Sequence, residues 1–358
     1  MANVFWSGHS LTDPPIPEFV ANISRSLGIS ADWNRHSMGG GSMFDRTRGR
    51  PPQEGGWAGY RQGNNRASIN MDVIEELTDP KTIAGNRYDF LVITEVHGIL
   101  WPLLRRDTVR LLRHYHERFI DGNPAGQTFL YQAWLSLADK NDPTSWIQYE
   151  RAAAPLWRCI ATRLNTSLEF EGRKDRIGFI PVGLALAELV DDKSEEPALN
   201  GISLDPHQTV TGLVFSDDVH VTRVGSYFVA LVTFAFIHDR SPIGAWHPPD
   251  INPDDAALFQ RFAADFMRNY RDDDSPLELS ECSKYVREKF AHEYWRYEIG
   301  RQPHNSESWW QLLLESSRRN IRRLRNTYTW QRSFAADAPD NPFRFDPATD
   351  EFYWHPAP

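Results

Sequence analysis

VFWSGHSLTD, at residues 4–13, is the stretch that decides the fold. Its apolar run is typical of a buried strand and breaks at Gly8, and Pro14 and Pro15 then prevent the strand from continuing. The sequence therefore predicts that Ser10 lies in a tight turn at the end of a rigid strand. A nucleophilic serine needs this placement, because the turn lifts its oxygen clear of the sheet. By itself the segment also fits an ordinary strand–loop junction that contains a serine.

A second informative segment, FSDDVHVT at residues 215–222, lies about two hundred residues downstream. In it Asp217 precedes His220 by three residues, just ahead of an apolar stretch at residues 227–237 that predicts a helix. A carboxylate at this spacing from a histidine supplies a general base together with the group that orients it.

Together the two segments resemble the SGNH (GDSL-type) hydrolases. In that family the nucleophile lies in the loop after the first strand, and an Asp-x-x-His motif lies near the C-terminus of the domain. The resemblance covers about residues 1–240. It implies that Ser10 is the nucleophile, His220 the general base and Asp217 the orienting acid, with Asp218 as the alternative acid.

The pattern between the two motifs alternates strands with helices. Such alternation implies a parallel sheet covered by helices on both faces, with the active site at the carboxyl ends of the strands. The resemblance implies the same architecture, a three-layer, flavodoxin-like α/β domain over residues 1–245. After the first strand, we expect strands at residues 29–33, 88–94, 128–134 and 177–183, and helices at residues 17–27, 107–120, from 144 onward and 184–190.

A run of three glycines, Gly39 to Gly41, provides the first candidate for an oxyanion hole. Glycine lets backbone N–H groups approach an anion closely, although the same run also fits a surface turn. The resemblance places an oxyanion-hole glycine in this block, and we assign that role to Gly40; Gly39 and Gly41 fit the spacing nearly as well.

The segment TEVHG at residues 94–98 departs from the family pattern. The family usually follows this strand with Gly-x-Asn-Asp, whose asparagine donates a hydrogen bond to the oxyanion. An ionised Glu95 only accepts hydrogen bonds and would repel an oxyanion. The candidate donor here is therefore a neutral His97, or Glu95 itself if burial keeps its carboxyl protonated. Glu95 is also a candidate for substrate binding.

Residues 45–70 are rich in Gly, Pro, Arg and Asn and predict a long loop. Loops of this length in compact domains tend to be functional or disordered. Two aromatic residues in it, Trp57 and Tyr60, either line a substrate cleft or anchor the loop to the body of the protein.

Composition narrows the class of partner. With 41% hydrophobic and 13% aromatic residues, the 358-residue chain is a folded protein. The net charge of −9 argues against nucleic acids and anionic membranes as partners, and the 13 tryptophans favour a carbohydrate ligand, because sugar rings stack on flat aromatic faces.

The cysteines and the N-terminus add three expectations. Cys159 and Cys282 lack metal-ligand spacing, so neither a metal nor an organic cofactor is expected, and the two cysteines are free or paired. The N-terminus lacks the basic and apolar regions of a signal peptide, which predicts a cytoplasmic protein unless a signal has been removed. No stretch approaches the roughly 20 apolar residues of a membrane span.

Residues 246–358 lie outside the resemblance and predict a helical C-terminal extension. Amphipathic helices are expected at residues 254–270, 278–297 and 306–328, and the last of them has an arginine-rich face. That face is either solvated or in contact with an acidic partner or a second subunit. The extension is expected to pack against the catalytic domain or to form a homo-oligomer interface.

The sequence thus predicts a serine esterase that hydrolyses an acyl ester, with an O-acetyl group on a carbohydrate as the favoured substrate. Two alternatives stay open. One is a carbohydrate-binding or scaffolding protein of the same fold with little or no turnover, and the other is an O-acyltransferase that uses the same triad.

Overall fold

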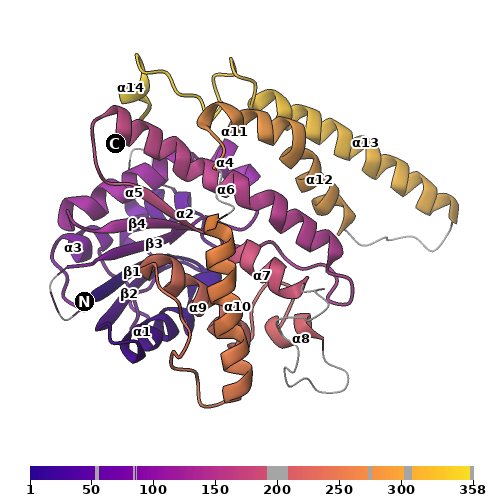
Figure 1. The fold of residues 1–358 in the computed structure, drawn as a ribbon. Helices are drawn as coiled ribbons and strands as arrows, with labels where there is room; N and C mark the ends of the chain where they lie inside the picture. The colour runs from indigo at the N-terminus through magenta and orange to yellow at the C-terminus, as the bar shows by residue number, and fades with distance from the viewer. Residues whose placement is uncertain are drawn as a thin grey trace.

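A five-stranded parallel sheet forms the centre of the computed structural model, which describes residues 1–52, 56–83, 85, 87–191, 209–272, 276–301 and 309–354 (Figure 1). Its strand order, β2-β1-β3-β4-β5, is that of flavodoxin-like doubly wound sheets, and each neighbouring pair is parallel. The predicted α/β class is therefore confirmed. The strands are β1 (Ala2–Gly8), β2 (Ala31–Ser37), β3 (Phe90–Thr94), β4 (Gln127–Tyr131) and β5 (Ile177–Ile180).

Helices cover the two faces of the sheet. α1 (Ile16–Ser26) and α9 (Arg223–His238) pack together on one face, and α5 (Thr108–Gly122) and α6 (Thr144–Phe170) lie on the other (Figure 1). Because both faces are covered, β1, β3 and β4 are largely apolar, and residues such as Phe5, Leu91 and Leu130 are fully buried. Shorter elements complete this part of the chain: η1 (Ser10–Thr12), α2 (Met43–Arg48), η2 (Ala58–Arg61), α3 (Val73–Thr78), α4 (Leu100–Arg105), α7 (Val182–Val190) and α8 (Val210–Val214).

The second strand differs from the prediction. We expected it at residues 29–33, whereas β2 extends to Ser37 and includes the polar residues Asn34, Arg35 and His36. These side chains are buried in polar contacts: Asn34 Nδ2 donates to Glu76 Oε1 (3.1 Å), and His36 Nδ1 lies 3.1 Å from the hydroxyl of Tyr115. Because β2 buries polar side chains against polar partners, its sequence lacks the apolar pattern from which a strand is predicted.

The long loop expected at residues 45–70 is also interrupted, because α2 and η2 form within it. A capping box starts α2: the Ser42 hydroxyl accepts a hydrogen bond from Asp45 N–H, and the Asp45 carboxylate accepts one from Ser42 N–H.

The C-terminal extension packs against the α/β body, which was one of its two predicted arrangements. α10 (Pro253–Asp272) lies on α9, where the rings of Phe228 and Phe259 are 6.0 Å apart. A continuous helical stretch lies on α6 and is tied to it by a Cys159–Cys282 disulfide. It consists of α11 (Leu279–Tyr285), the π-helical turn η3 (Val286–Phe290) and α12 (Ala291–Gly300).

The last two helices differ in how they meet the body. α14 (Asp350–Trp354) is anchored by a buried ion pair between Asp350 and Arg163 (2.5 Å). α13 (Trp309–Ser333) matches most of the helix expected at residues 306–328, of which 306–308 lie outside the described residues. It contacts α12 and exposes Ile321 and Leu324. In the described part of the chain, no helix is both long and apolar enough to cross a membrane.

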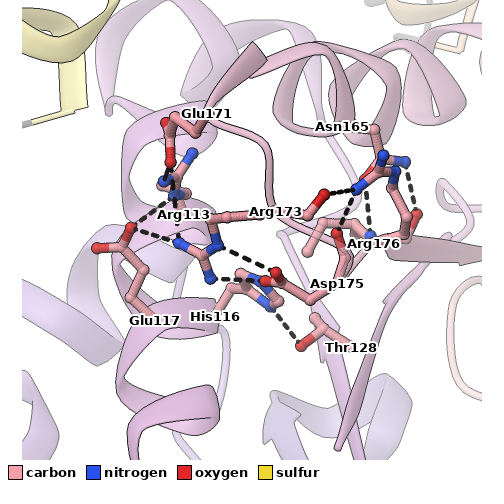
Figure 2. A network of polar contacts seen from close by, with 10 residues as sticks. Arg113, His116, Glu117, Thr128, Asn165, Glu171, Arg173, Asp175 and Arg176 are labelled. Carbon is pink, nitrogen blue, oxygen red and sulfur yellow. Dashed lines mark hydrogen bonds and ion pairs between the residues drawn. The ribbon is translucent and has the colours of Figure 1, made fainter. Parts of the chain in front are cut away.

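A polar network braces the sheet near the amino end of β4 (Figure 2). At its centre His116 is fully buried, with Nε2 2.7 Å from Asp175 Oδ2 and Nδ1 2.8 Å from Thr128 Oγ1. Hydrogen bonds from His116 and Arg173 hold the pKa of the Asp175 carboxyl well below its usual range. Since Thr128 is near the start of β4, this network lies away from the strand ends where a catalytic site is expected.

Candidate active site

Ser10 begins η1 directly after β1, where it is exposed to solvent. The turn requires a glycine at position 8, the last residue of β1, because a Cβ there would overlap the hydroxyl of Thr12. His9 is buried and turned away from Ser10: its Nε2 donates to the Glu95 carbonyl (3.1 Å), and its Nδ1 accepts from Leu11 N–H (3.4 Å). Burial, reinforced by the nearby Arg46 cation, lowers the pKa of His9 to about 3. His9 therefore shapes the turn and is not placed to act as a base.

The three residues of the predicted triad come together at the carboxyl edge of the sheet. His220 Nε2 lies 3.0 Å from Ser10 Oγ, and His220 Nδ1 lies 2.8 Å from Asp217 Oδ2. Asp217 Oδ1 accepts from the backbone N–H groups of His220 (2.6 Å) and Val219 (2.8 Å). These two backbone bonds hold the pKa of the Asp217 carboxyl at about 2. An ionised Asp217 keeps the proton of His220 on Nδ1, which leaves Nε2 free to accept a proton from Ser10.

The carboxylate that faces the His220 imidazole is that of Asp217 and not that of its neighbour Asp218, whose backbone carbonyl accepts a hydrogen bond from Leu137 N–H (2.6 Å). The triad is also open to solvent, since the side chains of His220 and Asp217 are 45% and 52% exposed. Water screens the attraction between the two groups at this exposure, so the hydrogen bonds, more than the charge, orient the imidazole.

The glycine run begins beside the turn that carries Ser10. Met38 N–H donates to the Gly8 carbonyl (3.1 Å), which joins the start of the run to the end of β1. Gly40 has a φ of +58°, a conformation that favours glycine, and its carbonyl accepts from Arg50 Nη2 (2.8 Å).

Arg46 holds the other end of the run, and sequence reasoning missed it. Its fully buried guanidinium donates to Ser7 Oγ (3.1 Å), the Gly41 carbonyl (2.6 Å) and the Thr94 carbonyl. It therefore joins the glycine run to the ends of β1 and β3. No local pattern indicates this role, because Arg46 stands among several arginines in a segment whose composition predicts a surface loop.

Glu95 points into the protein, and its carboxylate is fully engaged there. Oε1 accepts from the N–H groups of Met43 (2.9 Å) and Val96 (2.8 Å), and Oε2 accepts from Thr108 Oγ1 (2.8 Å). Burial raises the pKa of Glu95, and the neighbouring Arg46 cation opposes that shift. With no exposed surface, Glu95 holds the first residue of α2 and is not placed to bind a substrate or to donate to an oxyanion.

His97 lies near His9 and His220. Its ring is 6.4 Å from that of His9, edge to face. Burial lowers the pKa of His97, and the positive charge of Arg301 lowers it further. The imidazole is therefore neutral near pH 7, with one N–H group that can donate a hydrogen bond.

Trp57 and Tyr60 anchor their loop to α5. Trp57 stacks on His114 with ring centroids 3.6 Å apart, and Arg48 lies 3.7 Å over the Trp57 ring. The Tyr60 hydroxyl is 2.9 Å from His114 Nδ1. The structure thus favours the anchoring role over a place in a substrate cleft. Among the described residues, no three His, Cys, Asp or Glu side chains gather as a metal site would require.

Comparison with known proteins bears on the fold. No family model and no curated protein matches the chain. One similar solved structure is the crystal structure of a DUF4886 family protein from Bacteroides uniformis, which is 14% identical. The TM-score is 0.50, over 77% of this chain and 98% of that chain. At that identity the likeness concerns the fold alone, and it agrees with the α/β architecture.

Proposed function

We propose that the chain is a serine esterase of the SGNH type. The observation that carries this proposal is the hydrogen-bonded series from Ser10 Oγ through His220 to Asp217, with distances of 3.0 and 2.8 Å. A nucleophile, a base within reach of it and a third group that orients the base are the geometry of acyl transfer through serine.

In the proposed mechanism, Ser10 Oγ attacks the carbonyl carbon of an ester while His220 Nε2 takes its proton. The resulting imidazolium is stabilised by Asp217. When the tetrahedral intermediate collapses, His220 returns the proton to the departing alcohol, and the acyl group stays on Ser10. A water molecule, deprotonated by His220, then releases the acid and restores the serine.

The negative oxygen of the intermediate needs hydrogen-bond donors. The backbone N–H groups of Ser10 and Gly40 are the proposed donors, with the neutral His97 as a third. Arg46 and Glu95 support this arrangement from beneath, because they fix the ends of the glycine run and of α2.

The proposed substrate is an acyl ester on a carbohydrate. Several tryptophans are core residues, among them Trp6, Trp134 and Trp157, and these do not support sugar binding. Trp101 is the tryptophan that supports sugar binding, because its side chain is 45% exposed. It lies on α4, the helix that follows His97 at the carboxyl edge of the sheet, and its ring is 5.0 Å from the Arg106 guanidinium. An exposed indole beside a cation suits a sugar ring with hydroxyl groups.

A fluorophosphonate label tests the proposal directly. We expect one covalent adduct per chain by intact mass, its loss in Ser10→Ala, and the parallel loss of aryl-ester hydrolysis. Ser30→Ala is the matched control, since Ser30 is an exposed serine at the opposite edge of the sheet, just before β2. A folded native protein that takes no label and turns over no ester would refute the proposal and leave the binding-protein alternative. Product analysis with an acceptor alcohol distinguishes hydrolysis from acyl transfer.

A further inference from the structure

The catalytic loop, residues 215–222, rests on the segment that connects β4 to α6. Leu137 N–H donates to the Asp218 carbonyl (2.6 Å), and the indole N–H of Trp134 donates to the Val219 carbonyl (2.7 Å). Both carbonyls belong to the two residues between Asp217 and His220. The position of residues 134–138, which we call the support segment, therefore sets where the acid and the base lie.

The support segment is in turn held by the C-terminal extension. The hydroxyl of Tyr297, in α12, donates to the Ser136 carbonyl (2.5 Å) and accepts from Ala138 N–H (3.1 Å). The Ser136 carbonyl and the Leu137 N–H belong to one peptide group, and the Ala138 N–H belongs to the next. One oxygen atom therefore fixes the peptide group that donates to the catalytic loop and the group that follows it. The Tyr297 ring itself is fixed by stacking on Tyr149, with centroids 5.3 Å apart.

Tyr297 is not the only anchor of the segment. Leu135 N–H donates to Glu150 Oε1 (2.6 Å), and the Leu135 carbonyl accepts from the indole N–H of Trp146 (2.7 Å). Loss of the Tyr297 hydroxyl should therefore leave the segment attached at Leu135 while it frees the portion at residues 136–138 that contacts the catalytic loop.

We propose that Tyr297 is a positioning residue, through which the C-terminal extension holds Asp217 and His220 in line with Ser10. This inference rests on the proposed esterase function. It assigns a catalytic consequence to a part of the chain that lies outside the SGNH resemblance.

Tyr297→Phe tests the inference, and Tyr285→Phe is the matched control. Tyr285 also belongs to the extension, and its hydroxyl also donates to a backbone carbonyl of the α/β body, that of Ala152 (2.7 Å). That bond reaches α6, whereas the bonds of Tyr297 reach the support segment. Each variant keeps its ring and loses one hydroxyl group, which makes two hydrogen bonds at Tyr297 and one at Tyr285; the two hydroxyls differ in their connection to the catalytic loop.

Two measurements are needed. The first is hydrogen exchange of peptides that cover residues 132–140 and 214–222, and the second is kcat and KM for an aryl ester. For Tyr297→Phe we expect hydrogen exchange in both regions to accelerate by roughly 2- to 10-fold, because a lost buried hydrogen bond has an effect of this size. We expect kcat to fall by a similar factor, with KM unchanged. Tyr285→Phe should leave both readouts at the wild-type level although it loses its own hydrogen bond to the Ala152 carbonyl.

The inference is overturned if exchange at residues 214–222 is unchanged in Tyr297→Phe, if kcat is unchanged although exchange rises, or if both variants behave alike. Failure of the proposed function is a separate result: the native protein would then take no fluorophosphonate label. In that case the exchange experiment alone decides whether Tyr297 positions the loop.

Discussion

Asp217→Asn gives the sharpest test of how the triad works. In the native protein Asp217 Oδ1 accepts from two backbone N–H groups, and Oδ2 faces His220 Nδ1. An asparagine keeps its one oxygen toward the two N–H groups, which turns its NH₂ toward the imidazole. His220 Nδ1 must then accept a hydrogen bond, so the ring proton moves to Nε2. A protonated Nε2 cannot take the proton of Ser10.

The expected loss in kcat is about 10²- to 10⁴-fold with KM nearly unchanged. The upper value is typical of a buried acid in this role, and the 52% exposure of Asp217 allows water to reduce the effect. The rate of fluorophosphonate labelling should fall in the same proportion. Because the pKa of Asp217 lies at about 2, its carboxylate stays ionised above about pH 4, so titration of Asp217 does not affect the wild-type rate from about pH 5 to 8.

Asp218→Asn is the matched control, since it removes a charge one residue away without touching the imidazole. We expect its kcat to stay within about twofold of wild type, and both variants to melt near the wild-type temperature. The reasoning is refuted if Asp217→Asn keeps a rate within threefold of wild type, or if Asp218→Asn loses as much as Asp217→Asn.

Three further predictions concern the scaffold. Burial raises the pKa of Glu150 from 4.5 to about 8, so the folded state binds a proton that the unfolded chain has released, and stability falls as pH rises through this window. Glu150→Gln should remove that slope, which is at most about 1.4 kcal/mol per pH unit, in urea titrations; an equally steep slope in the variant would contradict this. The Cys159–Cys282 disulfide spans 123 residues, so replacing both cysteines with alanine should lower the free energy of unfolding by about 5 kcal/mol and Tm by about 6 °C. Two free thiols in the native protein before reduction would contradict this prediction. Trp57→Ala should cost about 0.5–1.5 kcal/mol through the lost stacking on His114 and leave KM unchanged; a selective rise in KM would instead place Trp57 in the substrate cleft.

The site residues that the sequence predicts are marked by patterns within a few neighbouring residues. Ser10 follows an apolar run that ends at a glycine, and Asp217 and His220 are three residues apart in one turn. The strands after residue 88 were found for the same reason, because a strand buried on both faces is a nearly unbroken apolar run. Chain order and the right-handed crossovers of parallel sheets then bring the two motifs to one edge.

The residues that were missed or misjudged depend on contacts between distant segments. Arg46 bonds to β1, β3 and the glycine run, and no local pattern marks a buried arginine. The position of Glu95 in the family pattern predicts a side chain near the substrate. The direction of that side chain depends instead on its hydrogen bonds to Met43 and Thr108. Tyr297 stands in a helix whose sequence indicates only an amphipathic face.

The disulfide between α6 and α11 closes residues 159–282 into a covalent ring. Asp217 and His220 lie inside this ring, and Ser10 lies outside it. A protease that cuts the backbone once between the two cysteines therefore leaves a single covalent molecule, which migrates as one species on a non-reducing gel and as two after reduction. Such a nick would also leave the base attached to the sheet that carries the nucleophile.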